Sequence, residues 1–149
     1  MVHPRNLVAY SLLLGAVAGT SVWIQFALRG GTLHWVPTLA AIAYYSLAGW
    51  GGLQLLRWHE GAAKVALAAV LPQVIQIQTG RFIYSVVCGP QLRIAIDAFG
   101  FDVRAGVGSV VEIGMVASTP RPTFAINVVA ILFAFYLRSQ SSRRRLTSA

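Results

Sequence analysis

The sequence predicts a membrane α+β protein with four transmembrane helices. A small antiparallel β-meander of three to four strands is expected on the extracytoplasmic side, between helices three and four. The 149 residues are 56% hydrophobic and only 11% charged, whereas a soluble domain carries about 25% charged residues. Several apolar runs approach the roughly 20 residues that a transmembrane helix needs. One later segment instead alternates apolar and polar residues, which is typical of half-buried strands.

The first two predicted spans are residues 7–28 and 33–56, which contain no Asp, Glu, Lys or Arg. The N-terminal region also has features of a secretory signal peptide, with a basic residue, an apolar run and a small-x-small stretch at Ala16-Val17-Ala18. The apolar run continues past Ala18 to residue 28. We therefore expect the first span to remain in the mature chain.

The third and fourth predicted spans are residues 62–80 and 123–137. The third follows a short polar turn and ends at Gly80, which is a natural helix stop. The fourth is short, so Arg138 would have to extend its side chain to the membrane surface. Residues 138–149 carry a triple arginine and are expected to form a basic disordered tail.

Residues 82–117 are predicted to form the β-meander. Five charged residues fall within this segment, and a charge at the bilayer centre costs about 2.5–3.5 kcal/mol, which disfavours a lipid-facing helix. The expected strands are residues 91–97, 101–107 and 110–117, with a fourth over 82–88 if that run also pairs. The expected turns are Gly89-Pro90, residues 98–100 and Gly108-Ser109.

Polar side chains inside the predicted third and fourth spans form the first candidate site. Its members are Gln73, Gln76, Gln78, Arg81 and Asn127. On a helix, Gln73 and Gln76 lie about 60° apart on one face, and Gln78 and Arg81 share another face, so no continuous polar stripe forms. Three interpretations remain open: hydrogen bonds between helices, a substrate or ion path, and a site for a lipid or quinone headgroup. If the third helix continued to Cys88, Arg81 would lie inside the bilayer and become a functional candidate.

Charged residues on the polar face of the meander form a second candidate site, for a lipid headgroup or a protein partner. They are Arg93, Arg104 and Glu112. Pairing Val107 with Val111 would place Arg104 diagonally opposite Glu112, which is a favourable neighbour across strands.

No catalytic, metal or cofactor site is predicted. Cys88 is the single cysteine, which excludes a cysteine-rich metal site. His34 and His59 flank the same predicted span and would lie roughly 37 Å apart, too far to share a metal. The net charge of +8 comes from basic residues scattered at span ends, so nucleic acid is not an expected partner.

The distribution of basic residues predicts that both termini face the cytoplasm, because more Lys and Arg then lie on that side. Abundant Ala, Gly and Arg favour a bacterial source and hence the bacterial inner membrane. We expect a non-enzymatic accessory or interaction subunit that binds another membrane protein or a second copy. The alternatives are a small oligomeric transporter or channel using Gln73, Gln76 and Arg81, and a lipid- or quinone-binding protein.

Overall fold

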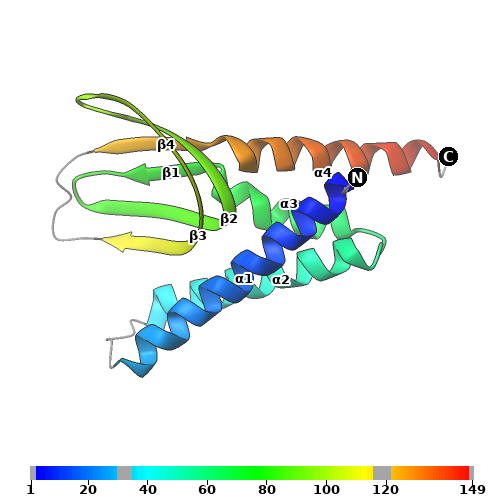
Figure 1. Ribbon diagram of the computed structural model, residues 1–149, viewed down its shortest axis with the longest axis horizontal. Coiled ribbons are helices and arrows are strands. Elements are labelled where there is room, and N and C mark those ends of the chain that lie inside the picture. Colours follow the sequence, from blue (N-terminus) through cyan, green and yellow to red (C-terminus); the bar gives the residue numbers. More distant parts are fainter. Residues whose placement is uncertain (1–2, 30–34, 116–121, 148–149) are drawn as a thin grey trace.

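The computed structural model describes residues 3–29, 35–115 and 122–147. These residues form four helices, one 3-10 turn and a four-stranded antiparallel sheet. In chain order the elements are α1 (Pro4–Leu28), α2 (Trp35–Leu56), α3 (Ala62–Val70), η1 (Leu71–Gln73), β1 (Ile75–Gln78), β2 (Phe82–Asp97), β3 (Gly100–Met115), β4 (Thr123–Asn127) and α4 (Val128–Thr147). Figure 1 shows α1 and α2 side by side, with the sheet and α4 in line beside them.

Helices α1 and α2 are long and apolar enough to cross a membrane, judged by length and composition. They contain 25 and 22 residues and pack closely through small side chains. Gly52 lies so near α1 that an added Cβ would come 2.9 Å from the Ala9 carbonyl oxygen. Large apolar side chains cover their outer surfaces, among them Leu7, Leu14, Val17, Ile24, Leu28, Trp35, Leu39, Ile42, Trp50 and Leu53.

The prediction of four transmembrane helices is wrong, because only α1 and α2 in the described parts of the chain are both long and apolar enough to cross a membrane. The predicted third span, 62–80, is helical only as far as Val70 and then passes through η1 into β1. Pro72 lacks the backbone N–H that a continuing helix needs. Beyond it, Ile75, Gln76, Ile77 and Gln78 alternate with the period of a strand, and they pair with β4.

The predicted fourth span, 123–137, is also wrong. Residues Thr123–Asn127 form β4, and α4 begins only at Val128. Asn127 sets this boundary, because its side-chain oxygen accepts a hydrogen bond from the Ala130 N–H (3.4 Å), as an N-cap residue does. The helix then continues to Thr147, through most of the region 138–149 that was expected to be disordered.

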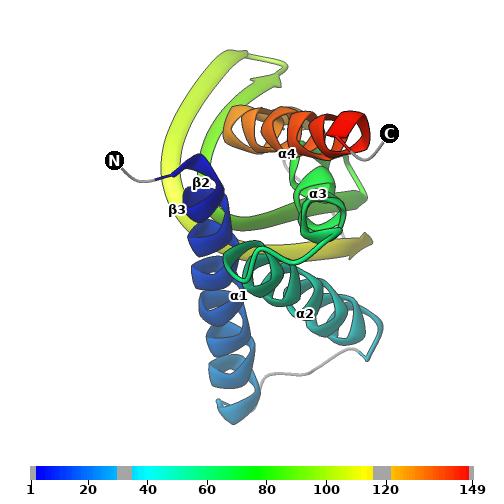
Figure 2. The ribbon, with the colours of Figure 1, turned by 90° about the vertical axis from the view of Figure 1, so that its right-hand side faces the viewer.

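The predicted meander is a single long hairpin in the structure. Strands β2 and β3 have 16 residues each and pair without interruption from Phe82↔Met115 to Asp97↔Gly100. The reversal at 98–99 falls inside the predicted turn at 98–100, but the other two predicted turns are wrong. Gly89 and Gly108 face each other within the hairpin, which is strongly curved (Figure 2). Gly89 has φ +102°, which residues with side chains rarely adopt.

The sheet closes partly on itself because β2 pairs with both β1 and β4. Its first half pairs with β1 (Ile77↔Tyr84) and its second half with β4 (Ile94↔Ile126), while β1 and β4 also pair with each other. Strand β3 pairs only with β2 among the described residues, so its outer edge is free.

The curved part of the hairpin packs against the middle of α1. The Ser109 hydroxyl donates a hydrogen bond to the Gly15 carbonyl oxygen (2.7 Å). A Cβ added to Gly15 would lie 2.6 Å from the Cys88 carbonyl carbon and 2.7 Å from the Gly89 nitrogen. The sheet therefore lies beside α1 and does not cap the ends of the helices.

We expect Gly15→Ala to destabilise the fold by about 1–3 kcal/mol, because the new methyl group overlaps the hairpin backbone. Gly49→Ala is the matched control, because its methyl group would lie 3.6 Å from the Ala16 Cβ, an ordinary contact. Replacing a helical glycine by alanine is otherwise favourable by about 0.5–1 kcal/mol. Thermal unfolding of both variants in detergent measures the difference. Equal stability of the two variants would rule out the close approach at Gly15.

Candidate functional site

The pairing register places most polar side chains of the sheet on one face. In the antiparallel pairs, Gln76 lies opposite Ala125, Ser85 opposite Glu112, and Arg93 opposite Asn127. The other face carries mainly apolar side chains, among them Ile75, Phe82, Ile94, Ile96, Phe101, Val103, Val107, Ile113, Met115, Phe124 and Ile126.

The polar face surrounds a small pocket of about 110 Å³. The lining residues with polar side chains are Gln76, Gln78, Tyr84, Ser85, Arg93, Glu112 and Thr123. The structure thus brings together four of the predicted candidate residues from both sets: Gln76, Gln78, Arg93 and Glu112. Sequence reasoning had placed the two glutamines in a membrane helix and the two charged residues in a separate sheet.

Two buried donors in this pocket lack acceptors within the described structure. They are the Gln76 amide nitrogen and the Arg93 Nε. Gln76 is only 7% exposed, and a buried donor without an acceptor costs about 1–3 kcal/mol. A bound molecule with oxygen acceptors, water included, would accept hydrogen bonds from both donors. No group of three or more His, Cys, Asp or Glu among the described residues could hold a metal ion.

Gln73 and Asn127 connect elements to one another. The Gln73 side chain donates to the Ala69 carbonyl oxygen (3.1 Å) and accepts from the Cys88 N–H (3.0 Å), which joins the end of α3 to β2. Asn127 is fully buried, and its side-chain oxygen accepts from the Leu92 N–H (3.3 Å) as well as capping α4. Both amides bond to backbone groups, whereas partners on neighbouring helices were expected.

Arg81 and Arg104 lie away from the pocket. Arg81 is exposed between β1 and β2. Arg104 forms an ion pair with Asp102 (2.7 Å) on the exposed part of β3. The predicted pairing of Val107 with Val111 is wrong, because these residues pair with Pro90 and Val86. The diagonal placement of Arg104 near Glu112 that depended on it does not occur.

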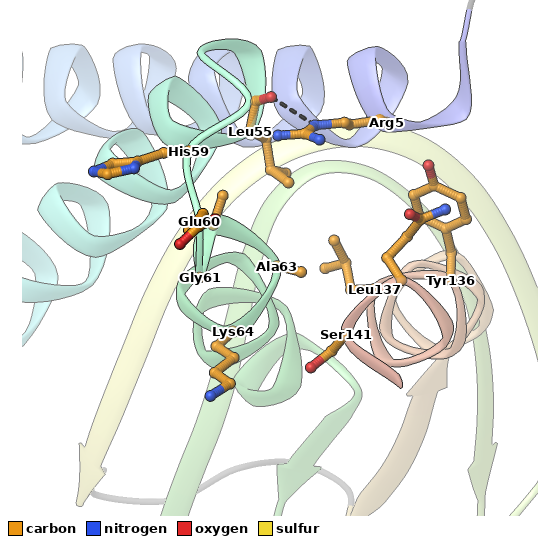
Figure 3. Close-up of a pocket in the computed structure, with 12 residues that line it drawn as sticks. Arg5, Leu55, His59, Glu60, Gly61, Ala63, Lys64, Tyr136, Leu137 and Ser141 are labelled. Atoms are coloured by element: carbon orange, nitrogen blue, oxygen red, sulfur yellow. Dashed lines mark hydrogen bonds between the residues drawn. The ribbon is translucent and has the colours of Figure 1, made fainter. Parts of the chain in front are cut away.

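A larger pocket of about 310 Å³ lies where α1 begins, between the α2–α3 turn and α4 (Figure 3). Arg5 is 7% exposed there. Its Nε donates to the Leu55 carbonyl oxygen (2.7 Å), and its guanidinium carbon lies 4.1 Å from the centre of the Trp58 ring. Lys64 and Tyr136 also line this pocket. Sequence reasoning used the basic residues near span ends only as markers of topology, and no local pattern signals that Arg5 and Lys64 line the same pocket.

Burial alters the acidity of two groups on β2. It raises the pKa of the Cys88 thiol to about 12, although a hydrogen bond with Tyr44 opposes the shift. Burial also raises the pKa of the Tyr84 hydroxyl, which donates to the Pro72 carbonyl oxygen (2.9 Å). A neutral, buried thiol is a poor nucleophile, so Cys88 acts as a packing residue.

We expect Gln73→Met to lower the free energy of unfolding by about 1–3 kcal/mol, because it leaves the buried Cys88 N–H without an acceptor. Gln76→Met makes the same chemical change at a similarly buried position, but it removes a donor that has no acceptor. It should therefore cost less. Denaturant titration of both variants in detergent tests the ranking, and a larger loss for Gln76→Met would contradict it.

We expect Cys88 to resist maleimide in the folded protein and to react once the protein is denatured. At pH 8 an ordinary thiol is about one-quarter thiolate, whereas a pKa near 12 leaves about one in ten thousand ionised. Mass spectrometry after timed labelling at pH 8 measures the rate. Fast labelling of the folded chain would show that the contact between α1 and the hairpin opens readily.

The chain was compared with protein-family models, curated protein sequences and solved structures. None of the three comparisons found a match. Both pockets are therefore interpreted from their own residues and geometry.

Proposed function

We propose that this chain is a non-enzymatic interaction subunit of a membrane complex, and that it assembles with a second copy of itself through the free edge of β3. One observation carries the proposal: the second edge of β3 pairs with no other strand among the described residues, and at Ser109 this strand lies against the middle of α1, a helix long enough to cross a bilayer.

Exposed apolar surface on α1 and α2 supports a membrane location, since lipid would cover it. Arg5, Arg57 and Lys64 gather where α1 begins and α2 ends, and the C-terminal end of α4 lies at the same end of the molecule (Figure 1). By the positive-inside rule, this end faces the cytoplasm. In a bacterium the membrane would be the inner membrane, with both termini inside.

In a membrane, the position of β3 makes the unpaired backbone groups of its free edge costly in free energy. Val107 pairs with Pro90, next to the residues that touch the middle of α1. At membrane depth an unpaired backbone N–H or C=O costs several kcal/mol, because lipid offers no hydrogen bonds. The apolar side chains of this segment suit lipid: Val107 is 83% exposed and Phe101 66%. The backbone edge therefore needs another strand.

Charge complementarity favours a second copy as that strand. Antiparallel pairing of two β3 edges about a two-fold axis at Val103 places Asp102 of each copy opposite Arg104 of the other. Opposite charges in directly facing positions contribute about 0.2–1 kcal/mol per pair. A register centred on Arg104 would instead place two arginines face to face. The axis at Val103 also keeps apolar side chains on one face and polar side chains on the other.

The transporter alternative is the weaker proposal because its three residues have different surroundings. Gln73 is held by two hydrogen bonds, Gln76 lines the sheet pocket, and Arg81 is exposed between strands. A shared path would require them to face one another.

Cysteine cross-linking tests the proposed pairing. In a Cys88→Ala background, Val103→Cys places two thiols directly opposite each other. Facing residues in an antiparallel pair have Cα atoms about 4.5–5.5 Å apart, which a disulfide can bridge. We expect mild oxidation of membranes to convert most of this variant to a covalent dimer, visible on a non-reducing gel.

Val107→Cys in the same background is the matched control. Val107 is more exposed than Val103, at 83% against 51%. In the proposed register, however, the two copies of residue 107 are offset from each other by eight residues along the paired strands, which is about 27 Å. Equal cross-linking at the two positions would indicate random collision. Absence of cross-linking at Val103, with an intact fold, would exclude this pairing.

A further inference from the structure

We propose that the small pocket inside the curved sheet binds a carboxylate group, with Arg93 and Gln76 as its main donors. These two residues lie on β2 and β1 and both line the pocket. The pocket volume of about 110 Å³ corresponds to roughly three to four water molecules at about 30 Å³ each. The pocket can therefore enclose only a few heavy atoms, which is the size of a short organic acid or of the end of a longer one.

Buried donors without partners indicate an acceptor in this pocket. The Gln76 amide nitrogen and the Arg93 Nε have no acceptors among the described residues. Asn127, which pairs with Arg93 in the sheet, has a third such donor in its amide nitrogen. The orientation of this amide is fixed, because its oxygen accepts from the Leu92 and Ala130 N–H groups. Buried donors are rarely left unpaired in folded proteins, so three of them on adjacent strands favour a bound molecule with oxygen acceptors.

The charge of Arg93 favours an anion over a neutral molecule. The residues that pair with Arg93 are Arg104 on β3 and Asn127 on β4, and neither is acidic. Like charges in facing positions are unfavourable, and Arg104 already forms an ion pair with Asp102. A carboxylate would neutralise the Arg93 guanidinium and could accept two of its N–H groups at once, in the paired geometry that arginine prefers.

Glu112 is the single acid among the described residues that line the pocket. It pairs with Ser85 in the sheet, and no ion pair joins it to Arg93 in the described structure. Its side chain is exposed, so it lies at the rim and would oppose the entry of an anion. Removal of this charge should therefore strengthen binding, and a loss of stability could not produce that result.

This inference goes beyond the proposed dimer and does not depend on it, because the pocket lies inside the curved sheet and the dimer uses the outer edge of β3. A free short acid and the end of a longer acyl chain could each supply the carboxylate. Acetate and butyrate distinguish these two sources, since they share the carboxylate and differ in the length of the apolar part.

The test measures the Tm of the full chain in an uncharged detergent and a carboxylate-free buffer at neutral pH. The probes are sodium acetate, sodium butyrate, sodium chloride and acetamide, which has the shape of acetate without its charge. A ligand that binds only the folded state raises the Tm as its concentration increases. A ligand as small as acetate binds at best with a Kd of tens of micromolar, and we expect about 1–10 mM. Acetate at about 50 mM should then raise the Tm by about 2–8 °C, and chloride and acetamide should raise it much less.

Three variants assign the shift to the pocket. Arg93→Gln removes the charge and should weaken the affinity for acetate at least about tenfold. Gln76→Met removes one donor and should weaken it about threefold to fivefold. Glu112→Gln should strengthen it about twofold to fivefold. Arg57→Gln is the control, because it removes an arginine charge at an exposed position outside the pocket and should bind like the parent chain.

Tm shifts in this order support the inference. Equal shifts with acetate and butyrate then assign the site to a free short acid, and a larger shift with butyrate assigns it to the end of a longer chain. If acetate acts no differently from chloride, the pocket holds water only and the inference is overturned. It is also overturned if the pocket variants respond like Arg57→Gln, because the shift is then a general salt effect, or if Glu112→Gln weakens binding. Gln76→Met and Glu112→Gln decide the question even if Arg93→Gln fails to fold.

Discussion

The close approach between α1 and the curved hairpin is the constraint on which the rest of the structure depends. Gly15 leaves no room for a side chain against Cys88 and Gly89, and Ser109 bonds to the Gly15 carbonyl oxygen. This contact holds β2 and β3 beside the helix pair. Gln73 reinforces it from the other side by accepting from the Cys88 N–H. The middle of β2 is therefore held between α1 and the end of α3.

This placement determines the orientation of the two sheet faces. The apolar face meets α1 at its centre and is exposed toward its ends, as at Ile96 and Met115. The polar face lies on the inside of the curved sheet, where Gln76 and Arg93 line a common pocket. Apolar residues outside and polar residues inside are the arrangement of a sheet surrounded by lipid, and in water the same arrangement would be unfavourable.

The sequence predicted some of these features because their signals are local. Long uncharged runs identified α1 and α2, and alternation identified strands within 82–115. The prediction of the third span was wrong because a short apolar run fits a helix or a strand equally well. The alternate spacing of Gln76 and Gln78 is the feature that distinguishes the strand from the helix. The meeting of these glutamines with Arg93 and Glu112 depends on long-range pairing. The position of Arg5 over Trp58 depends on tertiary packing, which no local pattern records.

The topology of the sheet also explains why an edge remains free. Because β2 curves, one of its edges accommodates both β1 and β4, while the other pairs with β3 along its entire length. Strand β3 then has no further strand of its own chain to pair with among the described residues. A soluble protein could leave such an edge to water, but at the membrane depth that we propose the edge could not rely on solvent. In the proposed dimer a strand of a second copy closes the sheet, and the Asp102–Arg104 pair gives the same segment of that copy complementary charges.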